Sequence, residues 1–277
     1  MDRRRKILVN RYEELTNEAL LRAAKKFGAH VFPKVRIADA MDINRSGLND
    51  QEYSYALKAH FDFIVTEKDL TVSFAVEFDE AYHKLGTDAA LKDELKNSIC
   101  SKLGLPLLRM TSEYLKAVGR FPSLVGWLVE IYFLCEGFYA AQQEGQIPDD
   151  EPWLWFSVLG YDPFISSRAF IQKTYSSGGC LQPKPEIIRT NNQKGHLESA
   201  LAILNVGDNQ YLIGFAQCAA VKFYAVPPSE LCEELAILAV SEDLDKFQRN
   251  QLKPYSLNEV AQWKVRMRQA EKRDRLL

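Results

Sequence analysis

The chain has 277 residues, of which 47% are hydrophobic and 26% are charged, and its formal net charge at pH 7 is −2. This composition is ordinary for a folded globular protein and argues against extensive disorder. The basic start, residues 1–6, lacks the apolar core of a signal peptide, and two glutamates interrupt the long apolar stretch at residues 123–141, as in a buried helix. Five widely spaced cysteines without a C-x-x-C pair are typical of reduced, mostly buried thiols. We therefore expect a cytoplasmic protein that does not cross a membrane.

The first expected elements are a helix, a strand and a loop. Apolar residues three or four positions apart predict a helix near the start of the chain: Tyr12, Leu15, Ala19, Ala23 and Phe27. Glu18 lies beside this stripe, so it could be an exposed residue on the helix surface or part of a functional site. Residues 31–37 suggest a short strand, and residues 42–53, which are rich in Asn, Asp, Ser and Gly, suggest a loop.

Two apolar runs, residues 60–65 and 71–78, are separated by a short polar segment, and this spacing predicts an antiparallel hairpin. Side chains alternate along a strand, so Glu77 and Asp79 share one face. Pairing around the turn would bring Asp62 close to both. An ionised carboxylate in so apolar a segment needs a hydrogen bond, a cation or a metal ion, and three converging carboxylates suit Mg²⁺ or Mn²⁺. The alternative is a set of structural salt bridges.

A second helix and another strand follow. Apolar residues four positions apart predict a helix over residues 87–103: Leu91, Leu95, Ile99 and Leu103. Gly104 is expected to end it. Asp93 and Lys96 lie three apart on its polar side, where they could simply pair with each other. The apolar run at residues 106–110 then predicts a buried strand, which completes an αβββαβ core.

These motifs, taken in order, resemble those of the PD-(D/E)XK, or restriction-endonuclease-like, nucleases. The specific likeness is to a bacterial branch of unknown function related to the very-short-patch-repair type endonucleases. In that branch a helical Glu and a strand Asp precede an E-x-D strand with a nearby His, a D-x-x-K helix and a G-x-P-L-L-R strand. The matching residues here are Glu18, Asp62, Glu77, Asp79, His83, Asp93, Lys96 and the segment 104–109. The likeness covers about residues 7–120 and depends on the ordered set rather than on one motif.

The resemblance implies hydrolysis of phosphodiester bonds with Mg²⁺ or Mn²⁺ as cofactor, by a DNA endonuclease of defence or repair. It assigns metal binding to Asp62, Glu77, Asp79 and Glu18. It assigns catalysis to Asp62, Glu77, Asp79, Lys96 and His83, with Asp93 in a supporting role. The nucleic-acid partner it implies is DNA.

Two departures from the superfamily pattern keep other hypotheses open. Asp79 stands where the superfamily usually has a Lys, two residues after the strand Glu, so the amine would come from Lys96. Glu80 stands where the branch often has Gly. A nuclease fold that has lost catalysis and serves as a nucleic-acid-binding or assembly module is therefore the second hypothesis. A hydrolase with a Cys or His nucleophile is the third, although no Cys lies in a recognisable reactive context.

The sequence predicts a mixed α/β protein in three regions. These are a nuclease-like domain (1–120), a helical connector (121–150) and a separate C-terminal α+β domain (151–277). In the last region, apolar runs on both sides of residues 205–209 predict a hairpin, and two helices end the chain. The final helix is expected to open with a capping box, Ser256-x-x-Glu259.

We recognise no motif in the sequence of the C-terminal region that indicates a chemical activity. We expect it to recognise nucleic acid or a protein partner, including a second copy of the chain. Residues 1–36 carry ten Lys or Arg and four Asp or Glu, and residues 246–277 carry nine and three. These basic ends are compatible with phosphate contacts, although charged ends are also commonly just solvated.

Overall fold

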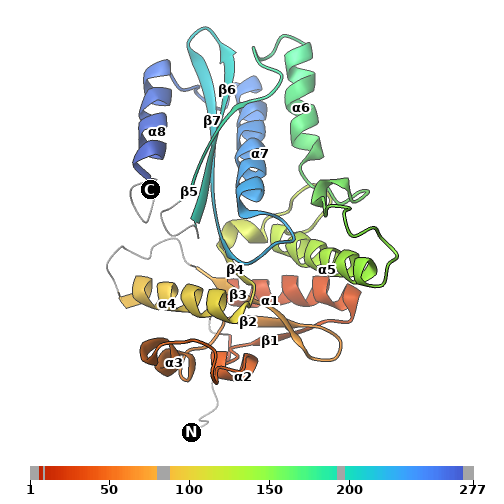
Figure 1. The fold of residues 1–277 in the computed structure, drawn as a ribbon. Coiled ribbons are helices and arrows are strands. Elements are labelled where there is room, and N and C mark those ends of the chain that lie inside the picture. Colours follow the sequence, from red (N-terminus) through yellow and green to blue (C-terminus); the bar gives the residue numbers. More distant parts are fainter. Residues whose placement is uncertain (1–5, 9, 80–87, 192–196, 271–277) are drawn as a thin grey trace. The chain divides into compact units, whose positions relative to one another are not determined.

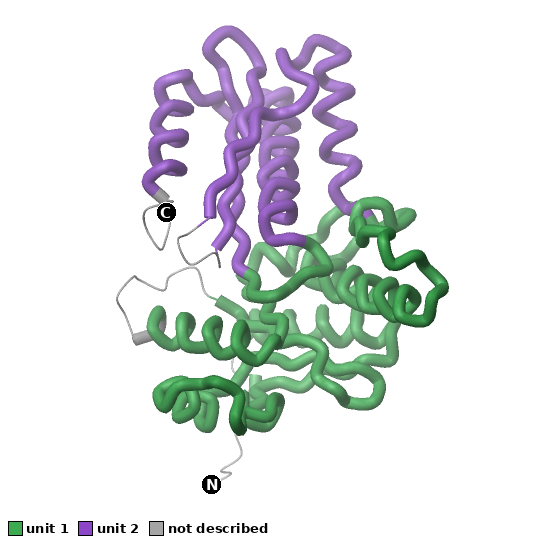
Figure 2. The backbone as a smooth tube through the Cα atoms, in the orientation of Figure 1, with its two compact units in different colours: residues 1–161, 220–226 green, residues 162–219, 227–277 purple. Residues whose placement is uncertain are grey.

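The computed structural model describes residues 6–8, 10–79, 88–191 and 197–270, which form two compact units. The first unit comprises residues 1–161 and 220–226, and the second comprises residues 162–219 and 227–277 (Figure 2). Both combine helices with strands, which confirms the expected mixed α/β class. The segment 121–150, expected to be a connector, lies inside the first unit.

Four strands form the sheet of the first unit: β1 (His30–Pro33), β2 (Phe63–Thr66), β3 (Val72–Phe78) and β4 (Leu107–Met110). They lie in the order β1-β2-β3-β4; the first two pairings are antiparallel and the third is parallel. The expected hairpin is confirmed, because Phe63 pairs with Val76 and Ile64 pairs with Ala75. Every residue of β2 and β4 is buried, as the apolar runs predicted.

Helices cover both faces of this sheet (Figure 1). On one face, α1 (Arg11–Ala24) packs against α5 (Leu124–Gln143). Tyr132 of α5 contacts Phe74 of β3 with ring centroids 4.6 Å apart, and its hydroxyl donates to the Ser73 carbonyl oxygen at 3.1 Å. On the other face, a buried core joins Ile64 and Ala75 to α2 (Ile37–Ala40), α3 (Asp50–Ala56) and α4 (Asp88–Leu103). The element order therefore matches the expected αβββαβ core, with α2 and α3 inserted after β1.

Helix α5 is the single helix in the described part of the chain that is long and apolar enough to cross a membrane. More than half of its apolar stretch is buried inside the protein, and Trp127, Leu128 and Ile131 are fully buried. This agrees with the expectation of a buried helix. Ser123 caps its first turn by accepting a hydrogen bond from the Gly126 N–H at 3.1 Å.

Three local expectations in this unit are wrong in detail. The strand expected over residues 31–37 ends at Pro33, because Lys34 has a left-handed backbone (φ 56°) that cannot continue a strand. The loop expected over residues 42–53 contains the start of α3, which a capping box between Asn49 and Glu52 opens. In α4, Leu91 is 58% exposed, so the apolar stripe begins only with the next turn.

The second unit is a three-stranded antiparallel sheet, β5-β6-β7, with helices on both faces (Figure 1). Its elements are α6 (Ile165–Ser176), β5 (Glu186–Asn191), β6 (Leu197–Gly207), β7 (Gln210–Val221), α7 (Pro228–Gln248) and α8 (Leu257–Ala270); the last two residues of β7 belong to the first unit. Val260 and Met267 of α8 pack on the face that carries Ile213. Helix α7 lies on the opposite face, where its backbone approaches Gly214.

Local signals placed the hairpin and last helix of this unit correctly. Asn209, with a left-handed φ of 56°, lies in the tight turn between β6 and β7, within the segment expected to turn. The capping box is also confirmed. The Ser256 N–H donates to Glu259 Oε2 at 2.8 Å, and the Glu259 N–H donates to Ser256 Oγ at 3.4 Å. By contrast, no pattern in the sequence predicted α6 or β5.

Candidate active site

The hairpin brings Asp62 and Glu77 together at one corner of the first unit. Asp62 directly precedes β2, and Glu77 is the second-last residue of β3. The Asp62 N–H lies 3.3 Å from Glu77 Oε1, and the Phe78 N–H donates to Asp62 Oδ2 at 2.9 Å. The expected approach of these two carboxylates is confirmed. Their catalytic role stays a prediction.

Lys96 of α4 reaches the same corner. Its Nζ lies 2.6 Å from Glu77 Oε2 and donates to the His60 carbonyl oxygen at 3.0 Å. Lys96 and Glu77 are both buried. Ala75 contacts the core on the α4 side of the sheet, and Glu77, two residues further along β3, faces the same side, so Glu77 and Lys96 meet between sheet and helix. Lys96 thus points into the cluster, and its catalytic role stays a prediction.

Glu77 is the most electrostatically perturbed acid of this corner. Its pKa is raised from 4.5 to about 7: burial is the largest cause and the negative charge of Asp62 adds to it, whereas Lys96 and Arg109 act in the opposite direction. Burial dominates because the ionised form loses most of its hydration. A carboxylate with a pKa near neutrality can exchange a proton at physiological pH, a property common in catalytic acids and bases.

Two residues that sequence reasoning missed complete the corner. Lys34 Nζ donates to Asp62 Oδ1 at 2.6 Å and to Glu13 Oε1 at 2.8 Å. Glu13 is buried in the first turn of α1, where the Asn10 side chain accepts a hydrogen bond from its N–H. An Asn N-cap followed three residues later by Glu is a signal that marks this helix start. Nothing comparable marks Lys34.

Asp79 does not join the carboxylate pair. Both of its oxygens accept from Arg109 Nη1, at 2.7 and 3.0 Å, and Arg109 Nη2 also bonds Asp93 Oδ1 at 3.2 Å. Arg109 lies in the fully buried strand β4, where it pairs in register with Glu77 of β3. A buried guanidinium needs carboxylate partners to offset its lost hydration. The expected convergence of three carboxylates is thus wrong for Asp79, and Asp93 pairs with Arg109 rather than with Lys96.

The other expected site residues lie elsewhere. Glu18 is exposed on α1 and lines a separate hollow of about 180 Å³, together with Arg22, Lys26 and Glu130. The carboxylate that α1 contributes to the cluster is Glu13. His83 and Glu80 lie outside the described residues.

A divalent ion finds two carboxylates at this corner. Asp62 and Glu77 offer hard oxygen atoms of the kind that Mg²⁺ and Mn²⁺ prefer, and their mutual repulsion favours a cation between them. Within residues 6–8, 10–79, 88–191 and 197–270, however, no group of three or more His, Cys, Asp or Glu could hold a metal ion. Asp62 and Glu77 could therefore supply two side-chain ligands for a divalent ion, and backbone carbonyls or water would have to supply the remaining ligands.

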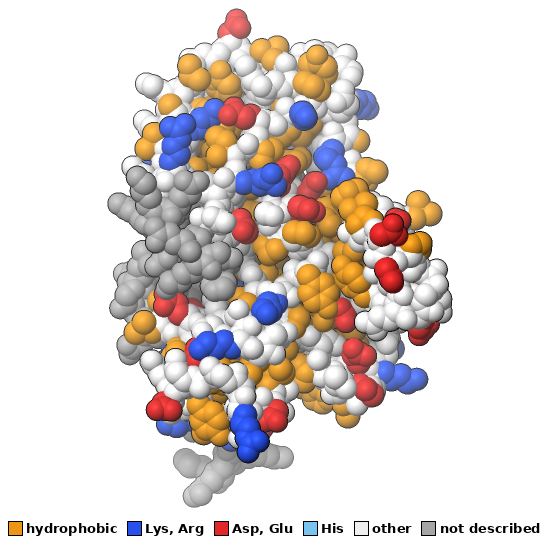
Figure 3. All heavy atoms as spheres, in the orientation of Figure 1, with side chains coloured by type: hydrophobic (Ala, Val, Ile, Leu, Met, Phe, Trp, Pro, Cys, Tyr) orange, Lys and Arg blue, Asp and Glu red, His pale blue; other side chains and the backbone are white. Residues whose placement is uncertain are grey.

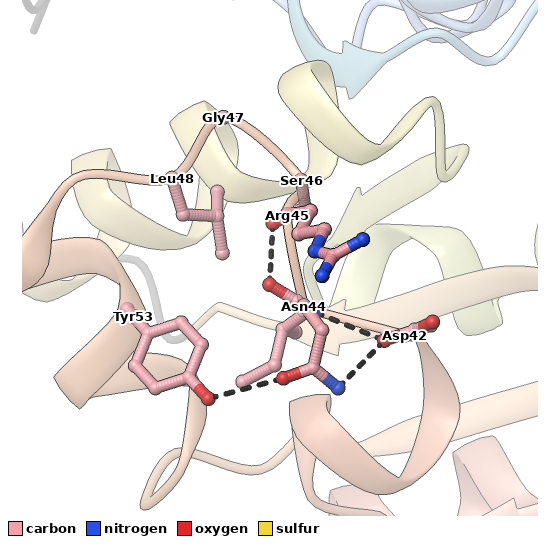
Figure 4. A pocket seen from close by; sticks show the side chains of 8 residues that line it. Asp42, Asn44, Arg45, Ser46, Gly47, Leu48 and Tyr53 are labelled. Atoms are coloured by element: carbon pink, nitrogen blue, oxygen red, sulfur yellow. Dashed lines mark hydrogen bonds between the residues drawn. The ribbon is translucent and has the colours of Figure 1, made fainter.

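A larger hollow, of about 620 Å³, lies at the loop between α2 and α3 (Figure 4). Its lining is Asp42, Ile43, Asn44, Arg45, Ser46, Gly47, Leu48 and Tyr53. The polar groups there mostly bond one another: Asp42 Oδ1 accepts from the Asn44 N–H at 2.9 Å and from its Nδ2 at 3.0 Å. This arrangement is typical of a loop that stabilises its own turn.

The five cysteines are all free and buried, which confirms the expectation of buried thiols. Burial raises the pKa of Cys100 and of Cys135 to about 12, so both stay protonated thiols at neutral pH. Since the thiolate is the nucleophile, this argues against the hypothesis of a Cys-dependent hydrolase.

Comparison with known proteins gives one match. A family model described as a protein of unknown function, DUF2726, matches residues 5–121, which is fewer than half of the 277 residues. The matched segment contains Glu13, Lys34, Asp62, Glu77 and Lys96. No curated protein and no solved structure matches the chain.

Proposed function

We propose that the chain is a cytoplasmic, divalent-metal-dependent nuclease of the PD-(D/E)XK type that hydrolyses phosphodiester bonds in DNA, in defence or repair. The observation that carries this proposal is the contact between half-buried Asp62 and buried Glu77, with Lys96 Nζ 2.6 Å from Glu77. Two acids from the ends of neighbouring strands and an amine from a nearby helix form the kind of group that metal-assisted hydrolysis needs. The second unit would recognise the DNA or a protein partner.

Each residue has a part that follows from its contacts. Asp62 and Glu77 would hold Mg²⁺ or Mn²⁺, which when bound polarises a phosphate oxygen and lowers the pKa of its water. Lys96 favours the ionised form of Glu77, against the effect of burial. Glu77 can hold or release a proton near pH 7. Arg109 fixes Asp79 and Asp93, and thereby the junction of β3, β4 and α4.

A specific observation favours the second hypothesis, a nuclease fold that binds without cutting. Each of the four oxygens of Asp62 and Glu77 already contacts a Lys or a backbone N–H of the protein. Charged side chains of both signs are interspersed on the face shown in Figure 3, where the described residues form no continuous basic patch. A protein of this kind would bind DNA, or assemble with a partner, without turnover.

A cleavage assay separates the two hypotheses. Full-length protein is incubated with supercoiled, nicked, linear and single-stranded DNA in Mg²⁺, Mn²⁺ or EDTA. We expect metal-dependent cleavage that Glu77→Gln reduces by about 100-fold or more, the scale on which positioned acids, bases and charges act. Binding without cleavage of any substrate would favour the second hypothesis.

The matched control is Glu52→Gln. Glu52 is also a buried Glu paired with a Lys, because Lys102 Nζ lies 2.6 Å from its Oε2, but it belongs to the α3–α4 contact. This variant should cleave like wild type per folded molecule. Equal activity of wild type and Glu77→Gln would falsify the proposed site.

A further inference from the structure

Two lysine ammonium groups flank the carboxylate pair, and they differ in how far they are enclosed. Lys96 contacts Glu77 Oε2 and the His60 carbonyl oxygen, and its Nζ lies 5.8 Å from the centre of the Phe61 ring. Its side chain is only 10% exposed. An anion arriving from solvent therefore finds this ammonium covered by protein on several sides.

Lys34 is the open one of the two. Its side chain is 31% exposed, although its Nζ contacts both Asp62 Oδ1 and Glu13 Oε1. A lysine ammonium has three donor hydrogens, and these two acceptors use two of them. The third donor and the exposed flank lie directly beside the carboxylate pair.

The backbone fixes Lys34 in this place. Its φ of 56° is in the left-handed region, which side chains with a Cβ rarely adopt, and its N–H donates to the Asp62 carbonyl oxygen at 2.9 Å. Such strain in a non-glycine residue clusters at functional sites. The same residue is thus bound to Asp62 through both its backbone and its ammonium group.

We propose that Lys34 binds the phosphate backbone of DNA by direct ionic contact. This inference rests on the proposed function, because the bound phosphate is the one presented to Asp62 and Glu77. Glu13 keeps the ammonium in position when Asp62 engages another cation. Lys96 stays paired with Glu77 and has no contact with DNA.

The test is the salt dependence of DNA binding in EDTA, where no cleavage occurs. Binding of a fluorescein-labelled DNA duplex is followed by anisotropy over a range of salt concentrations. Each lost phosphate contact makes the slope of log K against log salt shallower by about 0.9 for duplex DNA. We expect this change in Lys34→Met, whereas Lys34→Arg keeps the wild-type slope.

Lys26→Met is the matched control, because Lys26 also pairs with a buried glutamate, Glu130, at the hollow on α1. It should leave the slope unchanged. Thermal unfolding checks each variant, and Lys34→Gln, which retains hydrogen-bonding capacity without charge, replaces Lys34→Met if that variant does not fold.

The inference is overturned if the uncharged variant, Lys34→Met or Lys34→Gln in its place, keeps the wild-type slope, if Lys26→Met loses as much, or if wild type binds no DNA. Failure of the proposed nuclease activity alone gives a different result from failure of the Lys34 contact. Protein that binds DNA with a Lys34-dependent slope but cleaves nothing in Mg²⁺ or Mn²⁺ loses the catalytic proposal and retains the phosphate contact.

Discussion

The two units bury different kinds of polar group. In the described part of the chain, every buried charged side chain lies in the first unit: Glu13, Glu52, Glu77, Lys96, Arg109 and Glu130. In the second unit the buried polar side chains are hydroxyls: Ser167, Thr174, Thr190, Ser199 and Ser241. Burying a charge costs far more than burying a hydroxyl, so the first unit gives up stability that the second keeps. The difference points to the first unit as the place of chemistry.

The largest expected effect tests this cost directly. Lys96→Met leaves Glu77 buried without its ammonium partner, which should lower the free energy of unfolding by about 3–5 kcal/mol. Urea unfolding followed by tryptophan fluorescence measures it, since Trp127, Trp153 and Trp155 lie in the first unit. Lys116→Met, which breaks an exposed pair with Glu113, is the control and should cost less than about 1 kcal/mol. Equal losses of stability in the two variants would mean that burial does not make the Lys96–Glu77 pair more costly to break than an exposed pair.

A packing change in the second unit should come next. A Cβ at Gly214 would lie 2.0 Å from the Ala236 carbonyl oxygen and 2.7 Å from the Val240 nitrogen, both backbone atoms of α7. We expect Gly214→Ala to destabilise the protein by about 1–3 kcal/mol or more. Gly137→Ala on α5, where the added Cβ meets nothing within 4 Å, should instead stabilise by up to about 1 kcal/mol. A tolerated Gly214→Ala would show that α7 can shift away from the sheet.

The buried Glu77 of the first unit should also make the free energy of unfolding depend on pH. The pKa of Glu77 is raised from 4.5 to about 7, so between these values the folded protein binds a proton that the unfolded chain releases. Its contribution is therefore complete below about pH 4.5 and is lost as the pH rises through about 7, a change of about 3 kcal/mol. Lys96 and Arg109 oppose this shift and Asp62 adds to it. Glu77→Gln should change the difference in unfolding free energy between pH 4.5 and 8 by about 3 kcal/mol; an unchanged difference would mean that Glu77 titrates normally.

What the sequence could predict follows from how local each signal is. The alternation of residues 71–78 and a short turn were enough to place Glu77 beside Asp62. The four-residue spacing in α4 was enough to place Lys96 on that helix, although not to choose its partner. These signals depend on backbone periodicity, which a sequence displays directly.

The remainder of the cluster depends on tertiary placement. Glu13 and Glu18 are five residues apart, so they project about 140° apart around α1, and only docking of the helix decides which faces inward. Lys34 reaches Asp62 because the backbone turns left-handed after Pro33. The Glu77–Arg109 register, which draws Asp79 away, depends on how β4 pairs with β3. None of these three is visible in residue spacing.

The smallest expected effect lies at an exposed pair of the second unit. Lys264 Nζ donates to both oxygens of Glu186, at 2.7 and 3.0 Å, but both side chains are substantially exposed. Lys264→Ala should therefore cost about 0.2–1 kcal/mol at low salt and almost nothing near 1 M salt, where charges are screened beyond about 3 Å. The loss in Lys96→Met should persist at the same salt, because solvent ions do not reach a buried pair. If both losses faded together, burial would not distinguish the charges of the two units.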